Sequence, residues 1–297
     1  AGMSRIRAAD MAPLTLSGFN GDVIIENTAS GPPYTSYAVR VNPGEVWGFY
    51  ESGLPGKSYG LPVGGSFLSE VGDGTTFQFQ SYTANNALLL NSSAGTTGTL
   101  TLSTSETYSR MAIVAHSASG GGSASVTFNF ADGTTWTTTY NAPDWFNNAN
   151  FALSGTERIS INDGSTGGAP TNPRFYQTTI DLAGQLGSGN RPIASITFNQ
   201  VASAGATAVY AVSGEIAPPT PAFILVNPTN TTVVEATTAT FGAAGGGVPA
   251  PTLQWLRNGV PVSGATNSVY SFTAVLADHN STYRLVASNL VNSISSV

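Results

Sequence analysis

Short runs of alternating apolar and polar residues, separated by glycine, asparagine and proline, recur through most of the chain. The clearest run covers residues 125–130 (SVTFNF), where Val126, Phe128 and Phe130 share one face of an extended strand. Asp132-Gly133 follows at once, and glycine accepts the positive φ that a tight hairpin turn needs. We therefore predict a hairpin from Ser123 to Tyr140. No window keeps the 3.6-residue period of an amphipathic helix, so the pattern predicts an all-β fold.

Further runs of this kind predict about ten short strands in one large domain, which is typical of a β-sandwich and most of all of a jelly roll. The candidate strands cover residues 22–26, 36–41, 45–50, 76–82, 97–103, 110–116, 123–130, 134–140, 175–182, 193–199 and 206–213. Within 45–50, alternation buries Trp47 and Phe49 and turns Tyr50 outward. Residues 176–186 come closest to a helix, but a strand fits them better.

Charged residues make up only 9% of the 297-residue chain, against about 25% in a typical soluble protein. The net charge of −6 argues against a nucleic-acid partner, and Arg5 and Arg7 are the only close basic pair. No apolar run approaches the roughly 18–20 residues that a membrane span needs, so we expect no membrane insertion. Cysteine is absent, which excludes disulfides. We interpret the chain as a mature protein that is extracellular or on the cell surface after removal of a signal peptide.

A proline-rich stretch, residues 214–223 (GEIAPPTPAF), marks the strongest domain boundary. Proline lacks a backbone donor and favours an extended connector. The predicted organisation is an N-terminal extension (1–14), a jelly-roll β-sandwich (15–214), a linker (215–222) and a small second domain (223–297).

The second domain carries a recognisable pattern. Residues 247–259 (GVPAPTLQWLRNG) place Trp255 in a strand before an Asn-Gly hairpin, and residues 278–289 (DHNSTYRLVASN) place Tyr283 in a later strand. Both segments resemble an I-set immunoglobulin domain of the cysteine-free bacterial type. The resemblance implies that Ala243 and Leu285 take the two disulfide positions and pack against Trp255, and that Tyr283 forms the tyrosine corner. Only residues 293–297 remain for the last strand, so either the natural chain is longer or a strand from elsewhere completes the sheet.

The first domain has a looser resemblance, carried by residues 126–134, 143–146, 172–176 and 193–198. These segments are similar to galactose-binding-like, carbohydrate-binding jelly rolls of secreted bacterial proteins. The resemblance implies a sugar site on loops, where aromatic rings stack on sugar and polar groups bind hydroxyls. The candidate glycan-binding residues are Asp144, Trp145, Phe146, Asn147, Asn148, Arg174 and Tyr176. A packing role, in which Trp145 or Phe146 closes the end of the sandwich, is the favoured alternative.

Catalytic machinery is not recognisable in the sequence. Asp132, Asp144, Glu157, Asp163 and Asp181 supply carboxylates, but Asp132 suits a turn and Asp144 a loop. The histidines, His116 and His279, fall in different predicted domains, so a nucleophilic triad is disfavoured. We expect no enzyme and no cofactor. Residues 162–165 (NDGS) make Asp163 a weak candidate for structural calcium.

Three functions remain open at this stage. The favoured one is a structural or adhesive extracellular protein that associates with copies of itself in a filament, sheath or surface layer, with residues 1–14 as a candidate donor strand. The second is a glycan-binding module with an Ig-like spacer, whose partner is a polysaccharide. The third, held at low weight, is a fragment of a glycoside-active enzyme.

Overall fold

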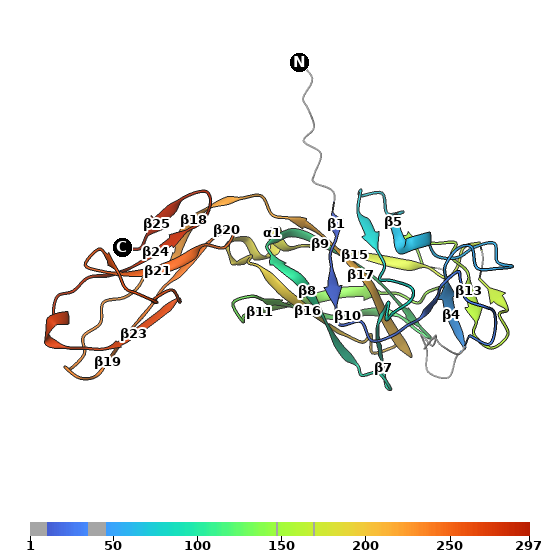
Figure 1. Ribbon diagram of the computed structural model, residues 1–297, viewed down its shortest axis with the longest axis horizontal. Coiled ribbons are helices and arrows are strands. Elements are labelled where there is room, and N and C mark those ends of the chain that lie inside the picture. Colours follow the sequence, from blue (N-terminus) through green and yellow to red (C-terminus); the bar gives the residue numbers. More distant parts are fainter. Residues whose placement is uncertain (1–10, 35–45, 147, 169) are drawn as a thin grey trace, which may run out of the picture. The chain divides into compact units, whose positions relative to one another are not determined.

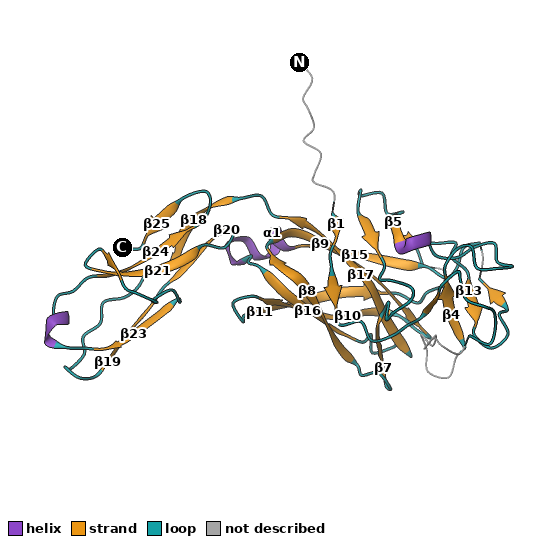
Figure 2. Ribbon diagram, in the orientation of Figure 1, coloured by secondary structure: helices purple, strands orange, loops and turns teal. Residues whose placement is uncertain are grey.

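The protein is all-β, as predicted, in a computed structural model that describes residues 11–34, 46–146, 148–168 and 170–297 (Figures 1 and 2). The one α-helix among these residues is α1 (Leu182–Leu186), which directly follows strand β15. The chain divides into two compact units. The first contains residues 1–182 and 193–215, and the second contains residues 183–192 and 216–297.

The largest sheet of the first unit is antiparallel and has the order β1-β17-β9-β15-β12, with β7 also paired to β17. Its strands are β1 (Ala12–Pro13), β7 (Leu88–Asn91), β9 (Tyr108–Ala118), β12 (Phe151–Leu153), β15 (Phe175–Asp181) and β17 (Ala206–Ile216). From Met111 to Ala115 in β9 every residue is fully buried. Since successive side chains point to opposite faces, this sheet is covered on both sides.

A five-stranded sheet with the order β11-β10-β16-β8-β2 forms a second layer. Its strands are β2 (Leu16–Ser17), β8 (Thr97–Glu106), β10 (Gly122–Phe130), β11 (Thr135–Ala142) and β16 (Ile193–Asn199). The predicted hairpin is confirmed, because β10 pairs with β11 and Phe128 lies opposite Trp136. Gly133 has a φ of +84°, and Val126, Phe128 and Phe130 are buried together as the alternation requires.

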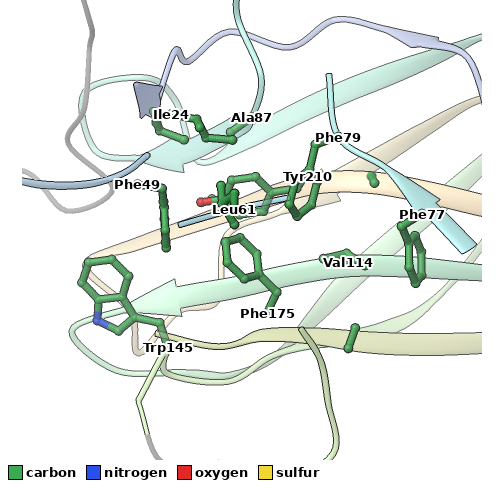
Figure 3. Close-up of a cluster of buried hydrophobic side chains, with 14 of the residues drawn as sticks. Ile24, Phe49, Leu61, Phe77, Phe79, Ala87, Val114, Trp145, Phe175 and Tyr210 are labelled. Atoms are coloured by element: carbon green, nitrogen blue, oxygen red, sulfur yellow. The ribbon is translucent and has the colours of Figure 1, made fainter. Parts of the chain in front are cut away.

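Short strands cover the other face of the six-stranded sheet. One small sheet has the order β14 (Thr166–Gly167), β13 (Arg158–Ser160), β4 (Trp47–Tyr50) and β3 (Ile24–Ile25), and a second pairs β5 (Ser66–Leu68) with β6 (Thr76–Gln78). Their apolar side chains meet Val114, Phe175 and Tyr210 of the large sheet in one aromatic-rich core (Figure 3).

Several sequence predictions need correction in this unit. Tyr50 is fully buried rather than outward, because a second cluster with Ile25 and Ile159 covers the far side of β4. Met11 is buried and β1 pairs with β17, so residues 11–14 belong to the first unit rather than to an extension. The predicted strand at 36–41 lies outside the described residues. The helix at 182–186 was predicted as strand.

The second unit is an Ig-like β-sandwich built from three groups of antiparallel strands. They are β18 (Thr220–Val226) with β20 (Ala244–Val248); β19 (Thr238–Gly242) with β23 (Val269–Thr273); and β22 (Val260–Pro261), β21 (Thr252–Arg257), β24 (Tyr283–Ser288) and β25 (Ser293–Ser295) in that order. Short 3₁₀ turns are η1 (Val63–Gly65) in the first unit and η2 (Gly187–Gly189) and η3 (Leu276–Asp278) in the second. Across the described part of the chain, no helix has the length and apolar character that crossing a bilayer requires.

Candidate functional site

The loop after β11 is held in place by Asp144. Its carboxylate accepts hydrogen bonds from the backbone N–H groups of Gly120 (3.0 Å) and Phe146 (3.1 Å). Gly121 lies against the same loop, since a Cβ atom there would stand 2.1 Å from the Asp144 nitrogen. Only glycine permits so close an approach of two backbones. Asp144 therefore fixes the loop, as its position after Pro143 predicted.

Trp145 is a core residue. Its side chain is 4% exposed, and its ring centroid lies 5.7 Å from that of Phe49 (Figure 3) and 5.6 Å from that of His116. The packing interpretation holds for Trp145, and an exposed stacking surface at this ring is excluded. Phe146 is half-buried, and the Arg158 guanidinium carbon lies 4.8 Å from its ring centroid.

Arg158 occupies the space between these aromatic side chains. Its guanidinium carbon is 4.3 Å from the Trp47 ring centroid as well, and 5.4 Å from that of Trp145. A guanidinium within about 6 Å of an aromatic centroid is attracted by the negative face of the ring. Phe146 is thus covered by an arginine of its own chain, which leaves little of the ring for a ligand.

A polar pocket of about 450 Å³ lies beside the loop, at the edge where β11 approaches β15. The polar part of its lining consists of Ser123, Asn141, Asp144, Asn148, Asn150, Tyr176 and Gln177. We name it the Asp144 pocket. It brings together three of the predicted glycan-binding residues, Asp144, Asn148 and Tyr176, and adds Asn141 and Gln177, which sequence analysis missed.

Tyr176 is 2% exposed, and among the residues that the structure describes its hydroxyl has no hydrogen-bond partner of good geometry, although the backbone and side chain of Asn148 are close enough to lower its pKa. Burial raises the pKa of Tyr176, so the phenol is neutral at physiological pH and retains its proton for donation. Buried polar groups in native proteins nearly always have a partner. The hydroxyl is therefore the group of this pocket most in need of a ligand or water.

Arg174 does not line the pocket. Its guanidinium donates to the backbone carbonyls of Asn148 and of Thr171 (3.0 Å for the latter), and it lies 4.7 Å from the Phe151 ring centroid. Arg174 therefore stabilises the loop from outside the pocket. The remaining candidate, Asn147, lies outside the described residues.

Three of the candidate carboxylates outside the pocket accept hydrogen bonds from other groups of the chain. Glu157 accepts from the Tyr50 hydroxyl at 2.5 Å, and Asp132 accepts from the Thr134 backbone N–H at 3.0 Å, as a turn former does. Asp163 accepts from the backbone N–H (3.0 Å) and hydroxyl (2.8 Å) of Ser165, and these bonds lower its pKa to about 2. In the described ranges no group of three acidic, histidine or cysteine side chains is placed to hold a metal ion. Asp163 thus has a local role as a turn residue.

The Ig-like core forms around Trp255, which is fully buried and donates its indole N–H to the Asn267 carbonyl at 2.9 Å. Ala243 and Leu285 pack in the same cluster, where the resemblance placed them. Tyr283 is half-buried against this core, and its hydroxyl reaches the Asp278 carboxylate at 3.3 Å.

A second hollow, of about 510 Å³, opens in the second unit between the stretch 228–235 and the start of β24. Its apolar lining includes Val233, Phe241, Phe272 and Tyr283. We name it the Tyr283 groove. The sequence analysis did not identify its aromatic residues as a group, because each one has the pattern of an ordinary strand residue. The short last strand at 293–297 was the one signal that pointed to this place.

No protein-family profile matches the chain, and no curated protein does so either. Among solved structures, the N-terminal four Ig domains of Dscam1 isoform 7.44 align with 61% of this chain and 40% of that one, at 15% identity and a TM-score of 0.26. The catalytic domain of a GH87 α-1,3-glucanase aligns with 46% of this chain and 23% of that one, at 16% identity and a TM-score of 0.28. An amphioxus IgVJ-C2 molecule aligns with 61% of this chain and 96% of that one, at 14% identity and a TM-score of 0.22.

The chain therefore spans less than half of the Dscam1 chain and less than a quarter of the glucanase chain. TM-scores this low carry no argument about function. The Asp144 pocket and the Tyr283 groove are the two candidate functional sites of the chain.

Proposed function

We propose that this chain is an extracellular structural or adhesive protein whose copies associate through the second unit, in a filament, sheath or surface layer. The observation that carries the proposal is a stretch of exposed backbone beside the Tyr283 groove. There the stretch 228–233 makes no backbone–backbone hydrogen bond within the described part of the chain, and residues 229–233 are exposed. Unpaired backbone next to an apolar hollow is a template for a strand from another molecule.

Sparse charge supports self-association. With 9% charged residues and a net charge of −6 spread over 297 residues, copies repel one another weakly. Threonine, serine and asparagine side chains hydrogen-bond across an interface at a smaller desolvation cost than ions do. An extracellular location, after removal of a signal peptide, belongs to the same proposal.

The test is the assembly state of the purified chain. Light scattering coupled to size-exclusion chromatography, over a wide range of concentrations, is expected to show species larger than 30.4 kDa. Negative-stain electron microscopy then distinguishes filaments from closed oligomers. A single 30.4 kDa species at every concentration would overturn the proposal.

A second candidate function, binding of a polysaccharide, is favoured by the Tyr176 hydroxyl at the Asp144 pocket, which has no well-aligned hydrogen-bond partner in the described part of the chain. Neutral donors and acceptors, such as the phenol and the amides of Asn141 and Asn148, suit sugar hydroxyls. The burial of Trp145 removes the stacking ring that the sequence analysis expected, so this candidate stands second.

A glycan array followed by calorimetry tests it. Tyr176→Phe and Asn148→Ala are expected to weaken binding of any hit at least about tenfold. Thr135→Ala, on the exposed face of β11, is the matched control and should leave binding unchanged. An array without hits, or equal binding by all three variants, would remove this candidate.

A further inference from the structure

The outer face of the five-stranded sheet carries uncharged polar side chains along four adjacent strands, β11, β10, β16 and β8 (Figure 1). Alternation turns Leu100, Phe128 and Phe198 into the core, and the residues between such positions point outward. Each outward position of residues 97–101, 123–129, 135–141 and 195–199 is a threonine, a serine or an asparagine. The face therefore offers hydroxyl and amide groups and no charge.

Hydrogen bonds between side chains hold these groups in rows that cross the strands. The Thr97 hydroxyl donates to the Asn199 side chain at 2.6 Å, and the Asn199 amide donates to the Ser125 hydroxyl at 2.7 Å. Two hydroxyl pairs at 2.9 Å form the neighbouring row, Thr127 with Thr137 and Thr99 with Thr197. Because these side chains are already held in place, a ligand that binds them removes little of their conformational entropy.

The rows reach the Asp144 pocket. Ser123 donates to Asn141 at 2.6 Å, and both residues line that pocket. Ser123 lies two residues before Ser125 on the same face of β10, so the polar face continues from the pocket toward β8. We name this surface the threonine track, and it consists of Thr97, Thr99, Ser123, Ser125, Thr127, Thr137, Asn141, Thr197 and Asn199. The row next to the Asp132-Gly133 turn, which contains Thr135, lies beyond the track.

The chemistry of the track suits a neutral ligand that is rich in hydroxyl groups. When two hydroxyls pair, as in Thr127 and Thr137, one O–H donates within the pair, the other is left for an outside acceptor, and both oxygens can still accept. The residues of the track do not ionise, and the described lining of the pocket contains Asp144 but no lysine or arginine. An anionic polymer therefore meets no cation here, whereas the hydroxyls of a neutral sugar meet both donors and acceptors.

A second copy of the protein fits this surface less well than a sugar chain does. Protein interfaces take most of their binding energy from buried anchors such as tryptophan, tyrosine and arginine, and threonine and serine are rare among these anchors. The track contains no aromatic residue and no arginine. The Asp144 pocket, in contrast, can hold one part of a ligand, so that weak contacts along the track add to an attachment that already exists.

We propose that a neutral polysaccharide bound in the Asp144 pocket continues along the threonine track as far as Thr97 and Thr99 of β8, so that the site selects long chains over short oligosaccharides. Adjacent strands stand about 4.8 Å apart and alternate residues of one strand about 6.7 Å apart, so the track extends the contact by roughly 20 Å. This inference rests on the second candidate function and states where its ligand runs.

The dependence of affinity on chain length is the first test. Cello-, xylo- and malto-oligosaccharides, each from the disaccharide to the longest soluble oligomer, are titrated into the full chain by calorimetry. In a series that binds, the affinity should rise at least about tenfold from the shortest to the longest ligand, because the pocket holds the remaining sugars close to the track. Polygalacturonate, an anionic polymer, should not bind. Equal affinity at every length would overturn the proposal.

Removal of hydroxyls from the track is the second test. Thr127→Val combined with Thr197→Val removes two hydroxyls from paired positions of β10 and β16 and keeps the branched shape that suits a strand. This double variant should bind the longest oligomer at least about fivefold more weakly than the wild type and bind the disaccharide equally well. Thr135→Val, the same substitution beyond the track, is the matched control and should bind as the wild type does. Equal melting temperatures of the three proteins show that the sheet is intact.

Tyr176→Phe separates the track from the pocket, because it should weaken the binding of every chain length alike. If it does so while the double variant binds long oligomers normally, polysaccharide binding stands and the track inference fails. If no neutral oligosaccharide binds, both fail. If the double variant changes the oligomer mass in sedimentation velocity and leaves sugar binding unchanged, the track is a contact between copies and the inference is overturned.

Discussion

The imidazole Nε2 of His116 lies 2.8 Å from the hydroxyl of Tyr210, and both side chains are fully buried. Phe49, Trp145 and Phe175 surround the imidazole, with ring centroids between 5.2 and 5.6 Å from it. Burial lowers the pKa of His116 to about 3. The native state therefore favours the neutral form of the imidazole over the protonated form.

Stability should fall in acid because of this residue. The unfolded chain protonates His116 near pH 6.5, whereas the folded chain does so only near pH 3. The stability that the neutral His116 side chain contributes is complete above pH 6.5, and it is lost as the pH falls toward 3. Between pH 6 and pH 4 this amounts to about 2 kcal/mol. Urea denaturation of wild type and His116→Phe at both pH values checks it: the variant should show a smaller loss, and an equal loss would contradict the prediction.

Asp22 should have the opposite effect on the pH dependence of stability. Burial raises the pKa of its carboxyl to about 6, even though Asn86 donates a hydrogen bond to it at 2.8 Å. A raised carboxyl pKa favours folding at low pH, and that contribution is lost as the pH rises through about 6. Asp22→Asn should thus raise the melting temperature at pH 8 and have little effect at pH 3.5, below the ordinary pKa of 3.8 that the unfolded chain has. Equal shifts at the two pH values would count against the assignment.

Gly121→Ala should be strongly destabilising. The new Cβ would lie 2.1 Å from the Asp144 backbone nitrogen, so the loop would have to move. We expect a loss of about 2 kcal/mol or more in the free energy of unfolding. Gly242→Ala is the control, because no atom lies within 4 Å of its added Cβ, and it should change stability by less than about 0.5 kcal/mol. Similar values for the two variants would refute the steric argument.

Trp145→Ala tests whether this tryptophan is a core residue. Removing a buried tryptophan costs about 3 to 5 kcal/mol, through lost burial and the cavity left behind. Chemical denaturation should therefore show a large loss of stability. A loss below about 1 kcal/mol would mean that the ring is not packed as the structure shows.

Local pattern predicted much of the fold. The 123–140 hairpin followed from alternation plus Asp132-Gly133, and the environment of Trp255 followed from the resemblance of residues 247–259 and 278–289 to an I-set Ig domain. Strand β7 was missed, because Leu88–Leu90 is a run of three leucines with no alternation. All three are buried in a strand that pairs with β17. A strand covered on both faces has no period to detect.

The candidate sites show the same division between what local pattern predicts and what it misses. Asp144 was correctly placed in a loop, because its neighbour Pro143 and its own side chain favour turns. Local spacing does not encode that Trp145 points into the core, or that Asn148 and Tyr176 border one pocket. These positions depend on which sheets pack against the loop, and such contacts join residues far apart in the chain.

By itself the amino-acid sequence determined that this chain forms β-strands and where several tight turns fall, because backbone geometry and side-chain alternation act over a few residues. The tryptophan-centred core of the second unit was predicted from the resemblance to a cysteine-free Ig domain. Tertiary structure alone decided that Tyr50 is buried, that Arg158 covers Phe146, and that the groove beside Tyr283 has an unpaired wall. Each of these depends on a layer or strand contributed from elsewhere in the chain, and burial is a property of the assembled layers rather than of any one strand.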